Sequence, residues 1–263
     1  MNALIPVDKL CRIGGEFVFV RQWNSACAGS SIPIILIHDS LGCVELWREF
    51  PRTLAERLGR AVVAYDRLGY GRSSARSDLP ALDFIQFEAE QILPAILLQL
   101  GIQNHVLFGH SVGGSIALCA AANAGLRCQG VVSESAQPFI EELTLDGIRE
   151  AKKRFQDPDY FDRLRKWHGE KAQWVLDAWT ETWLSPRFAK WSLFPYLRRV
   201  ECPVLVIHGE QDEFGSVRFP GTIHEQVSGP AECHILKDCG HVPHREMPEV
   251  VIGLLSQFAP LRS

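Results

Sequence analysis

Short apolar runs rich in branched side chains alternate along the chain with longer segments whose apolar residues recur at helical spacing. The short runs predict strands near residues 16–21, 33–38, 61–65, 105–109, 130–134, 203–208 and 231–236. Helical patterns lie between most of them, such as residues 46–58, 84–100 and 248–258. Strands that alternate with helices predict a mostly parallel sheet covered on both faces, with the first strand or two antiparallel at one edge.

Residues 137–200 break this alternation. The segment has no convincing strand, carries helical patterns and contains five of the seven tryptophans, which are Trp167, Trp174, Trp179, Trp183 and Trp191. Tryptophan buries a large area and has one N–H donor, so these residues can line an apolar pocket or form the core of a separate lobe. A basic cluster at 149–154 is a solvated helix face or a site for an acidic substrate tail.

The segment Gly109-His110-Ser111-Val112-Gly113-Gly114-Ser115 lies between a predicted strand and an alanine-rich and leucine-rich helical run. Glycines on both sides of Ser111 allow the backbone to reverse within a few residues. A serine on such a turn stands at the top of a sheet, and the amide of Val112 at the helix N-terminus faces a position where an anion can form. Ser111 is therefore the candidate nucleophile, although the bare Gly-x-Ser-x-Gly pattern also occurs in turns with an incidental serine.

A serine hydroxyl is a weak nucleophile and needs a histidine base and an acid that orients this base. His241 follows the predicted strand at 231–236, and Asp212 follows the strand at 203–208. Both are expected on loops at strand ends, from which a side chain can reach Ser111. The chain order of serine, acid and histidine differs from the orders found in chymotrypsin and subtilisin.

Four segments resemble the α/β-hydrolase superfamily, and together they cover almost the whole chain. They are residues 34–42, 64–73 with an Asp-x-x-Gly-x-Gly-x-Ser turn, 109–115, and 240–249, which begins Gly-His-Val-Pro. The resemblance implies a mostly parallel, eight-stranded sheet with helices on both faces. It also implies a core domain of residues 1–136 and 201–263 and a helical cap at 137–200, inserted after the sixth strand.

The resemblance also implies an oxyanion hole. A tetrahedral intermediate places negative charge on an oxygen atom and therefore needs hydrogen-bond donors. By the resemblance, these donors are the backbone amides of Val112 and Ser40. The sequence departs from the family here, since Asp39 stands where His-Gly-x-x-Gly usually has its glycine. His38 is expected to brace this loop through its ring rather than to take part in the chemistry.

Other residues compete for each role. Glu134 follows the predicted strand at 130–134, where some relatives carry their acid, and is the alternative to Asp212, whose Gly-x-x-Asp context matches the usual acid turn. His110 and His208 lie at strand ends and are expected to be structural. Asp66 is expected to shape a tight turn. His244 and Glu246 lie just past the candidate base, and they either support His241 or begin a surface helix.

Composition excludes several classes of protein. The 263 residues are 46% hydrophobic and 22% charged, with a net charge of −4, which gives no reason to expect nucleic acid as a partner. No apolar run is long enough to span a bilayer, and residues 1–8 lack the features of a signal peptide. The eight cysteines are scattered, and no histidine and cysteine cluster has the spacing of zinc ligands. We therefore expect a cytoplasmic monomer or homodimer with reduced thiols, no metal and no cofactor.

These observations predict a serine hydrolase that acts on a carboxylic ester or lactone of a small to medium apolar or aromatic compound. Carbon-carbon bond hydrolysis of a diketone ring-cleavage product is the main alternative, because similar proteins perform it with this triad under a comparable cap. Thioester cleavage and a peroxide-forming side activity stay open, whereas serine at position 111 disfavours haloalkane dehalogenation. A ligand receptor with little turnover is the alternative from a different class.

Overall fold

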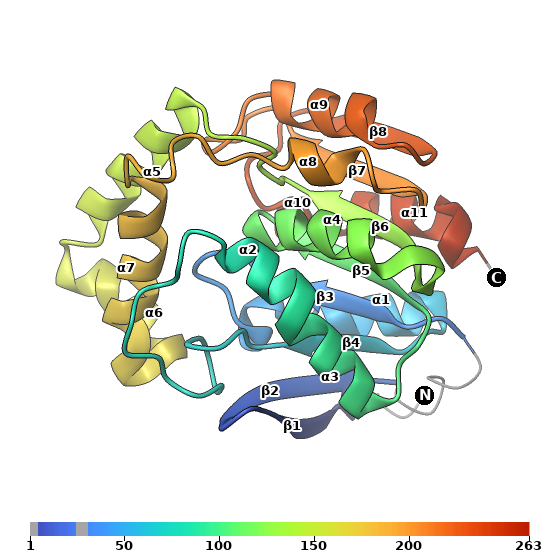
Figure 1. Ribbon diagram of the computed structural model, residues 1–263, viewed down its shortest axis with the longest axis horizontal. Helices are drawn as coiled ribbons and strands as arrows, with labels where there is room; N and C mark the ends of the chain where they lie inside the picture. Colours follow the sequence, from blue (N-terminus) through green and yellow to red (C-terminus); the bar gives the residue numbers. More distant parts are fainter. Residues whose placement is uncertain (1–4, 25–30, 263) are drawn as a thin grey trace.

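The computed structural model describes residues 5–24 and 31–262. Its centre is an eight-stranded sheet with the strand order β1-β2-β4-β3-β5-β6-β7-β8 (Figure 1). Strands β1 and β2, and β2 and β4, pair antiparallel, whereas all the other neighbours are parallel. The strands are β1 (Val7–Ile13), β2 (Glu16–Trp23), β3 (Ile34–Ile37), β4 (Val62–Tyr65), β5 (His105–His110), β6 (Cys128–Glu134), β7 (Val204–Gly209) and β8 (Ala231–Leu236).

Strand β1 is absent from the strands that the sequence pattern predicts. It pairs with β2 along its whole length, from Val7 opposite Gln22 to Ile13 opposite Glu16. It is an outer strand, and Cys11 is its one buried residue. A strand that buries so little has no need of the alternating apolar pattern by which strands are recognised.

The central strands of the sheet are buried on both faces. In β3, Ile35 and Ile37 belong to one apolar cluster, whereas Ile34 and Leu36 belong to the other. Helices α1 (Phe50–Leu58) and α11 (Pro248–Gln257) pack on the second cluster. The first is covered by α2 (Phe84–Phe87), η3 (Glu88–Ile92), α3 (Leu93–Leu100), α4 (Val112–Ala124), α8 (Phe194–Leu197) and α9 (Arg218–Gln226).

The predicted helix at 84–100 is not regular throughout. Its middle part, η3, is a π-type turn that leads directly into α3, in which Pro94 occupies the first turn. Proline has no N–H to donate to the preceding turn, so a wider turn before it avoids the loss of a regular α-helical hydrogen bond.

Residues 137–200 contribute no strand to the sheet. They form α5 (Glu142–Arg154), α6 (Pro158–His168), η5 (Gly169–Lys171), α7 (Ala172–Trp183) and α8. Helices α5, α6 and α7 lie together at one side of the sheet, on the left in Figure 1. Helix α8 instead lies over the sheet and contacts α4 and α9.

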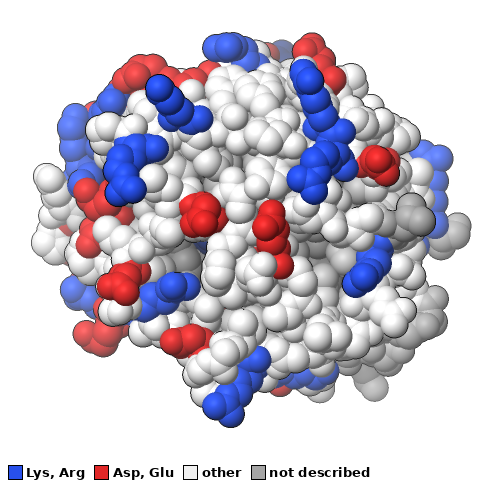
Figure 2. All heavy atoms as spheres, viewed as in Figure 1, with Lys and Arg blue, Asp and Glu red and all other residues white. Residues whose placement is uncertain are grey.

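Other features concern the surface and the thiols. Among the described residues, no helix combines the length and apolar character that a membrane span requires. Acidic and basic side chains are interspersed on the face shown in Figure 2. The seven described cysteines are all free thiols. Cys27 and residues 1–4, the first half of the N-terminal segment without signal-peptide features, lie outside the described residues.

Candidate active site

Ser111 occupies a sharp turn between β5 and α4. Its backbone has φ 56° and ψ −125°, a conformation that residues other than glycine rarely adopt. The turn is closely packed, because a Cβ atom at Gly109 would overlap the backbone of Gly113, and one at Gly113 would overlap the carbonyl group of Ile37. The N–H of Ser111 donates to the carbonyl oxygen of Glu134 at 2.8 Å. The glycines around the serine are therefore required by the space available, as the sequence predicts.

Two backbone amides near Ser111 are available to a ligand. Val112 is the first residue of α4, where an N–H group has no acceptor within the helix. Ser40 lies in the loop after β3, and its N–H makes no hydrogen bond with any described residue. Ser40 and Ser111 line the same cavity. These amides are the two that the family resemblance implies as donors of an oxyanion hole.

His241 and Asp212 are in direct contact. The Nδ1 atom of His241 lies 2.8 Å from both carboxylate oxygens of Asp212, which also accepts a 2.8 Å hydrogen bond from the N–H of Phe214. Burial acts to raise the pKa of Asp212, but the imidazoles of His241 and His208 and the Phe214 amide together lower it. An ionised Asp212 accepts the Nδ1 proton of His241, which leaves Nε2 free to accept a proton.

The loop that carries His241 is held on both sides. Glu246 accepts hydrogen bonds from the N–H groups of Gly240 at 2.7 Å and Val242 at 2.9 Å, the two neighbours of His241. The carbonyl oxygen of His241 accepts a 2.8 Å hydrogen bond from Nε2 of His110, the residue before the serine. The loop is therefore tied directly to the turn of Ser111.

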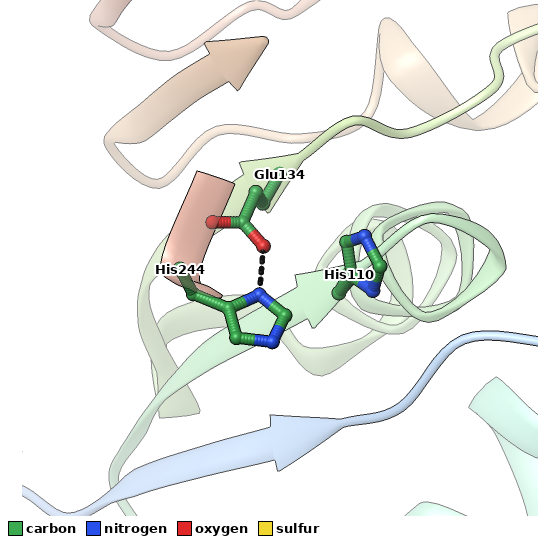
Figure 3. Close-up of side chains that lie close together, drawn as sticks. All are labelled: His110, Glu134 and His244. Atoms are coloured by element: carbon green, nitrogen blue, oxygen red, sulfur yellow. Dashed lines mark hydrogen bonds and ion pairs between the residues drawn. The ribbon is translucent and has the colours of Figure 1, made fainter. Parts of the chain in front are cut away.

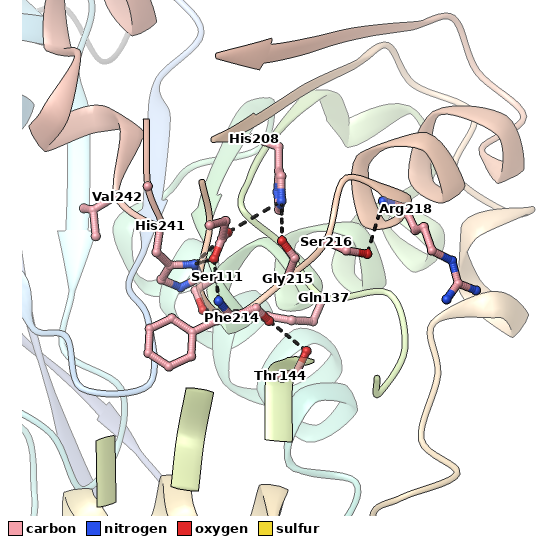
Figure 4. A network of polar contacts seen from close by, with 12 residues as sticks. Ser111, Gln137, Thr144, His208, Phe214, Gly215, Ser216, Arg218, His241 and Val242 are labelled. Atoms are coloured by element: carbon pink, nitrogen blue, oxygen red, sulfur yellow. Dashed lines mark hydrogen bonds and ion pairs between the residues drawn. The ribbon is translucent and has the colours of Figure 1, made fainter. Parts of the chain in front are cut away.

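Ser111 and His241 both line a cavity of about 300 Å³. Figure 4 shows their side chains together with Phe214, whose ring centroid lies 4.9 Å from that of His241. Among the residues of segment 137–200 that line the cavity are Trp179 and Trp183. Trp183 also packs against Phe188 and Trp191, so part of the tryptophan cluster is the core of the helical segment itself.

Glu134, the alternative acid, does not contact His241. Its carboxylate lies 2.5 Å from Nδ1 of His244, and Figure 3 shows this pair beside His110. Both residues are buried, and the His244 ring packs on Trp47 with ring centroids 4.5 Å apart. Burial lowers the pKa of His244, although Glu134 opposes this effect. A neutral His244 therefore donates its Nδ1 proton to Glu134.

Asp39, the departure from the family pattern, is bound to His110. Its carboxylate lies 3.3 Å from Nδ1 of His110, and it also accepts a 2.7 Å hydrogen bond from the N–H of Leu41. His110 thus donates from both nitrogens, to Asp39 and to the carbonyl of His241. Burial acts to lower the pKa of His110, but Asp39, the His241 carbonyl and the nearby Glu134 raise it to about 9.

This arrangement bears on metal binding. His110, Glu134 and His244 place possible ligand atoms within 4.8 Å of one another. A histidine ligand must offer a lone pair to the metal. Both nitrogens of His110 are used as donors, and the Glu134 oxygen nearest His244 accepts its proton. The three residues fit a hydrogen-bonded network better than a set of metal ligands.

The remaining residues that the sequence singles out have structural contacts. His38 bonds to the carbonyl of Asp39 at 2.8 Å and accepts the N–H of Arg67 at 3.0 Å, so its ring braces the loop. His208 bonds to the carbonyl of Gly215 at 2.9 Å. Asp66 shapes the turn after β4 by accepting the N–H groups of Val44 at 2.6 Å and Arg72 at 2.7 Å.

Comparison with known proteins assigns the family. A model of the alpha/beta hydrolase family matches residues 34–254. The chain belongs to this family.

Several relatives of this α/β-hydrolase are hydrolases. Serine hydrolase BPHL from Homo sapiens is 29% identical over 211 residues, which cover 75% of this chain and 68% of that protein. Proline iminopeptidase from Lactobacillus helveticus is 22% identical over 264 residues, which cover 86% of this chain and 89% of that protein. Among solved structures, 2-hydroxy-6-oxo-6-phenylhexa-2,4-dienoate hydrolase from Rhodococcus sp. strain RHA1 superimposes with a TM-score of 0.79 and 20% identity, covering 99% of this chain and all of that one.

Two contacts in the site of this α/β-hydrolase are not predicted by the sequence. One is the pair of Asp39 and His110, and the other is the bracing of the His241 loop by both oxygens of Glu246. The signal for the first was the aspartate in a glycine position. For the second, the sequence pointed to the residue, but the two amides that it binds are visible only in the fold.

Proposed function

We propose that the protein is a serine hydrolase that cleaves a carboxylic ester or lactone of a small to medium apolar or aromatic compound. The observation that carries the proposal is the contact of His241 with Asp212 on the wall of the cavity that also contains Ser111. Ser111 itself is held in a conformation with positive φ on a tightly packed turn. Strain of this kind persists where the surrounding structure enforces it, and it is concentrated at functional sites.

The proposed reaction has two steps. His241 accepts the proton of Ser111 through Nε2 as the oxygen attacks the carbonyl carbon, and it then donates that proton to the leaving group. Water attacks the acyl-enzyme by the same route in reverse. Asp212 orients the imidazole and stabilises its charged form. The amides of Val112 and Ser40 stabilise the oxyanion, and the loss of one such donor costs about 3–4 kcal/mol in comparable enzymes.

The cavity supports a small, partly aromatic substrate. Its volume of about 300 Å³ lies at the lower end of the range for small-molecule sites. Its wall includes Phe155, Tyr160, Trp179, Trp183 and Phe214. We propose residues 137–200 as a cap that excludes water from the oxyanion, with the rest of the chain as the catalytic core. The proposed enzyme is a cytoplasmic monomer or homodimer that needs no metal and no cofactor.

A second reaction is proposed as the alternative. The likeness in fold to the dienoate hydrolase, over nearly the whole of both chains, favours carbon-carbon bond cleavage of a diketone ring-cleavage product. The identity of 20% leaves the two reactions to be separated by experiment. Turnover of a panel of esters, lactones and vinylogous diketones, compared by kcat/KM, ranks them directly.

The decisive test concerns Ser111. The native protein should release p-nitrophenol from short-chain p-nitrophenyl esters and be labelled by a fluorophosphonate probe at Ser111, as located by peptide mass spectrometry. Ser111→Ala should lose both signals and unfold with an unchanged urea midpoint. Labelling at another residue would move the nucleophile elsewhere. Absence of both signals from the native protein would favour a receptor on the hydrolase fold.

A further inference from the structure

Two arginines line the cavity without a partner of their own. Arg154 is the last residue of α5, and Arg245 lies in α10 (Pro243–Glu246), four positions after His241. Neither guanidinium group makes a hydrogen bond or an ion pair with any residue that the structure describes. The two positive charges therefore reach the same cavity from the helical segment and from the sheet domain.

The neighbours of Arg154 in the basic cluster behave differently. The other three members, which do not line the cavity, are all paired with acids. The pairs are Arg149 with Glu142 and Asp146, Lys152 with Glu181, and Lys153 with Glu150. The structure thus divides the cluster into a solvated face and one free cation at the cavity.

The cavity wall near Arg154 is apolar and extends toward the loop that carries Asp212 and Phe214. Thr144, Ile148, Ala151 and Arg154 follow one face of α5, and all four line the cavity. Thr144 donates a 2.7 Å hydrogen bond to the carbonyl of Phe214, close to the acid Asp212. Ten helical residues span about 15 Å, so Arg154 lies well away from the reacting atoms. Ile148 and Ala151 occupy the intervening wall.

Neither carboxylate on the cavity wall forms an ion pair with Arg154 or Arg245. Asp39 is already paired with His110. Glu213, beside Asp212, lines the cavity but has no ion-pair partner among the described residues. An arginine without a protein partner has its full set of donors available, and the guanidinium fork matches the geometry of a carboxylate.

We propose that the substrate carries a carboxylate that is bound by Arg154 and Arg245, with an apolar or aromatic segment between this group and the reacting carbonyl. This inference rests on the proposed hydrolysis at Ser111 and names the substrate class of that site. A carboxylate held by both arginines joins α5 to α10 across the cavity. It places the carbonyl group at the far end of the substrate against Ser111.

Matched esters test this inference. The p-nitrophenyl half-ester of adipic acid and p-nitrophenyl hexanoate have acyl chains of equal length that differ in one terminal carboxylate. The native protein should favour the half-ester in kcat/KM by about tenfold at low salt, and the preference should fall as salt is added. Arg154→Gln and Arg245→Gln should each reduce this preference several-fold, mainly through KM for the half-ester.

Two further variants complete the test. Arg149→Gln is the matched control, since it lies on the same helix, is paired with acids and does not line the cavity, so its preference should equal that of the native protein. Glu213→Gln removes a negative charge from the wall and should increase the preference for the half-ester. Equal kcat/KM for both esters in the native protein, or equal losses for both esters in the two arginine variants, would overturn the inference.

Binding separates this inference from the proposed function. If neither ester is turned over, the proposed reaction fails, but the anion site is still measured by calorimetry on Ser111→Ala. The probes are 6-phenylhexanoate and 6-phenylhexan-1-ol. The acid should bind about tenfold more tightly than the alcohol, and the added substitution Arg154→Gln should remove most of the difference. Equal affinities for the acid and the alcohol would overturn the proposed anion site, whether or not Ser111 is the nucleophile.

Discussion

Two histidine-carboxylate pairs lie close to each other in this protein, and their surroundings differ. In one pair, His241 bonds to Asp212 at 2.8 Å, and its side chain is 12% exposed on the wall of the cavity. In the other, His244 bonds to Glu134 at 2.5 Å, and its side chain is 4% exposed. Both carboxylates are completely buried.

The difference between the pairs is one of access. His241 lines the cavity that Ser111 also lines, whereas the ring of His244 is enclosed by Trp47 and Phe50, with ring centroids 4.5 and 5.3 Å away. The same chemical pair therefore serves as a proposed base in one place and as a buried polar bracket in the other. A histidine-carboxylate contact does not identify a catalytic site unless the imidazole can reach a substrate.

Removal of each histidine should produce the largest contrast. His241→Gln should lower kcat for a p-nitrophenyl ester by on the order of 10⁵-fold to 10⁶-fold, because the nucleophile loses its base. His244→Leu should lower kcat by less than about tenfold and reduce the free energy of unfolding by about 1–3 kcal/mol, since Glu134 loses a buried donor. Steady-state kinetics and urea unfolding measure the two effects. Similar losses of kcat in both variants would contradict the comparison.

The carboxylates should repeat this contrast on a smaller scale. Asp212→Asn should reduce kcat by about 10³-fold to 10⁴-fold, because the amide no longer holds the required tautomer of His241. Glu134→Gln should change kcat by only a few-fold. Kinetics with a saturating ester give both values. A larger loss of kcat in Glu134→Gln than in Asp212→Asn would make Glu134 the functional acid.

The loop of His241 provides a weaker perturbation. Glu246→Ala removes the acceptor of two backbone amides and should lower kcat by about tenfold to 100-fold, since the imidazole is held less accurately. The substitution should leave the reactivity of Ser111 toward a fluorophosphonate measurable but slower. Glu246→Gln, which keeps one acceptor oxygen, should recover part of the rate. Unchanged kcat in Glu246→Ala would show that the bracing has no catalytic consequence.

The smallest expected effect concerns Asp39 and pH. The pKa of His110 is raised to about 9 in the folded protein, against an ordinary value of about 6.5. Its charge therefore contributes stability that is fully present below about pH 6.5 and is lost as the pH rises toward 9. Asp39→Asn should reduce this pH-dependent change, which amounts to about 1–3 kcal/mol. Urea unfolding at pH 6 and pH 9.5 gives the change in the free energy of unfolding between the two pH values. An equal change in the native protein and in Asp39→Asn would contradict this prediction.

Most of the fold follows from patterns in the sequence. The predicted strands all appear within a few residues of their expected positions. The buried parallel strands, such as β3 and β7, are nearly continuous apolar runs. The family match over residues 34–254 confirms the α/β-hydrolase fold. The sequence pattern does not predict strand β1, because this strand lies at an exposed edge. It does not predict the π-type turn η3 either, because Pro94 changes the turn without changing the apolar pattern.

The candidate site was less accessible to prediction. The positions Ser111, Asp212 and His241 come from local turn patterns and their order along the chain. The choice between Asp212 and Glu134 as the partner of His241 depends on which loop tips meet, and the structure brings Asp212 to that imidazole. That Asp39 contacts His110 could not be read from residues that lie far apart in the sequence.

The sequence by itself determined the alternation of strands and helices, the turn at Ser111 and the loops that carry its two proposed partners. Those features depend on local backbone preferences and on which residues leave water. Only the tertiary structure decided which histidine lines the cavity, which carboxylate it contacts and which arginines of the cavity wall have no protein partner. Such choices depend on distances between separate segments of the chain, such as the one between His110 Nε2 and the carbonyl oxygen of His241, which lie 131 residues apart in the sequence and 2.8 Å apart in the structure.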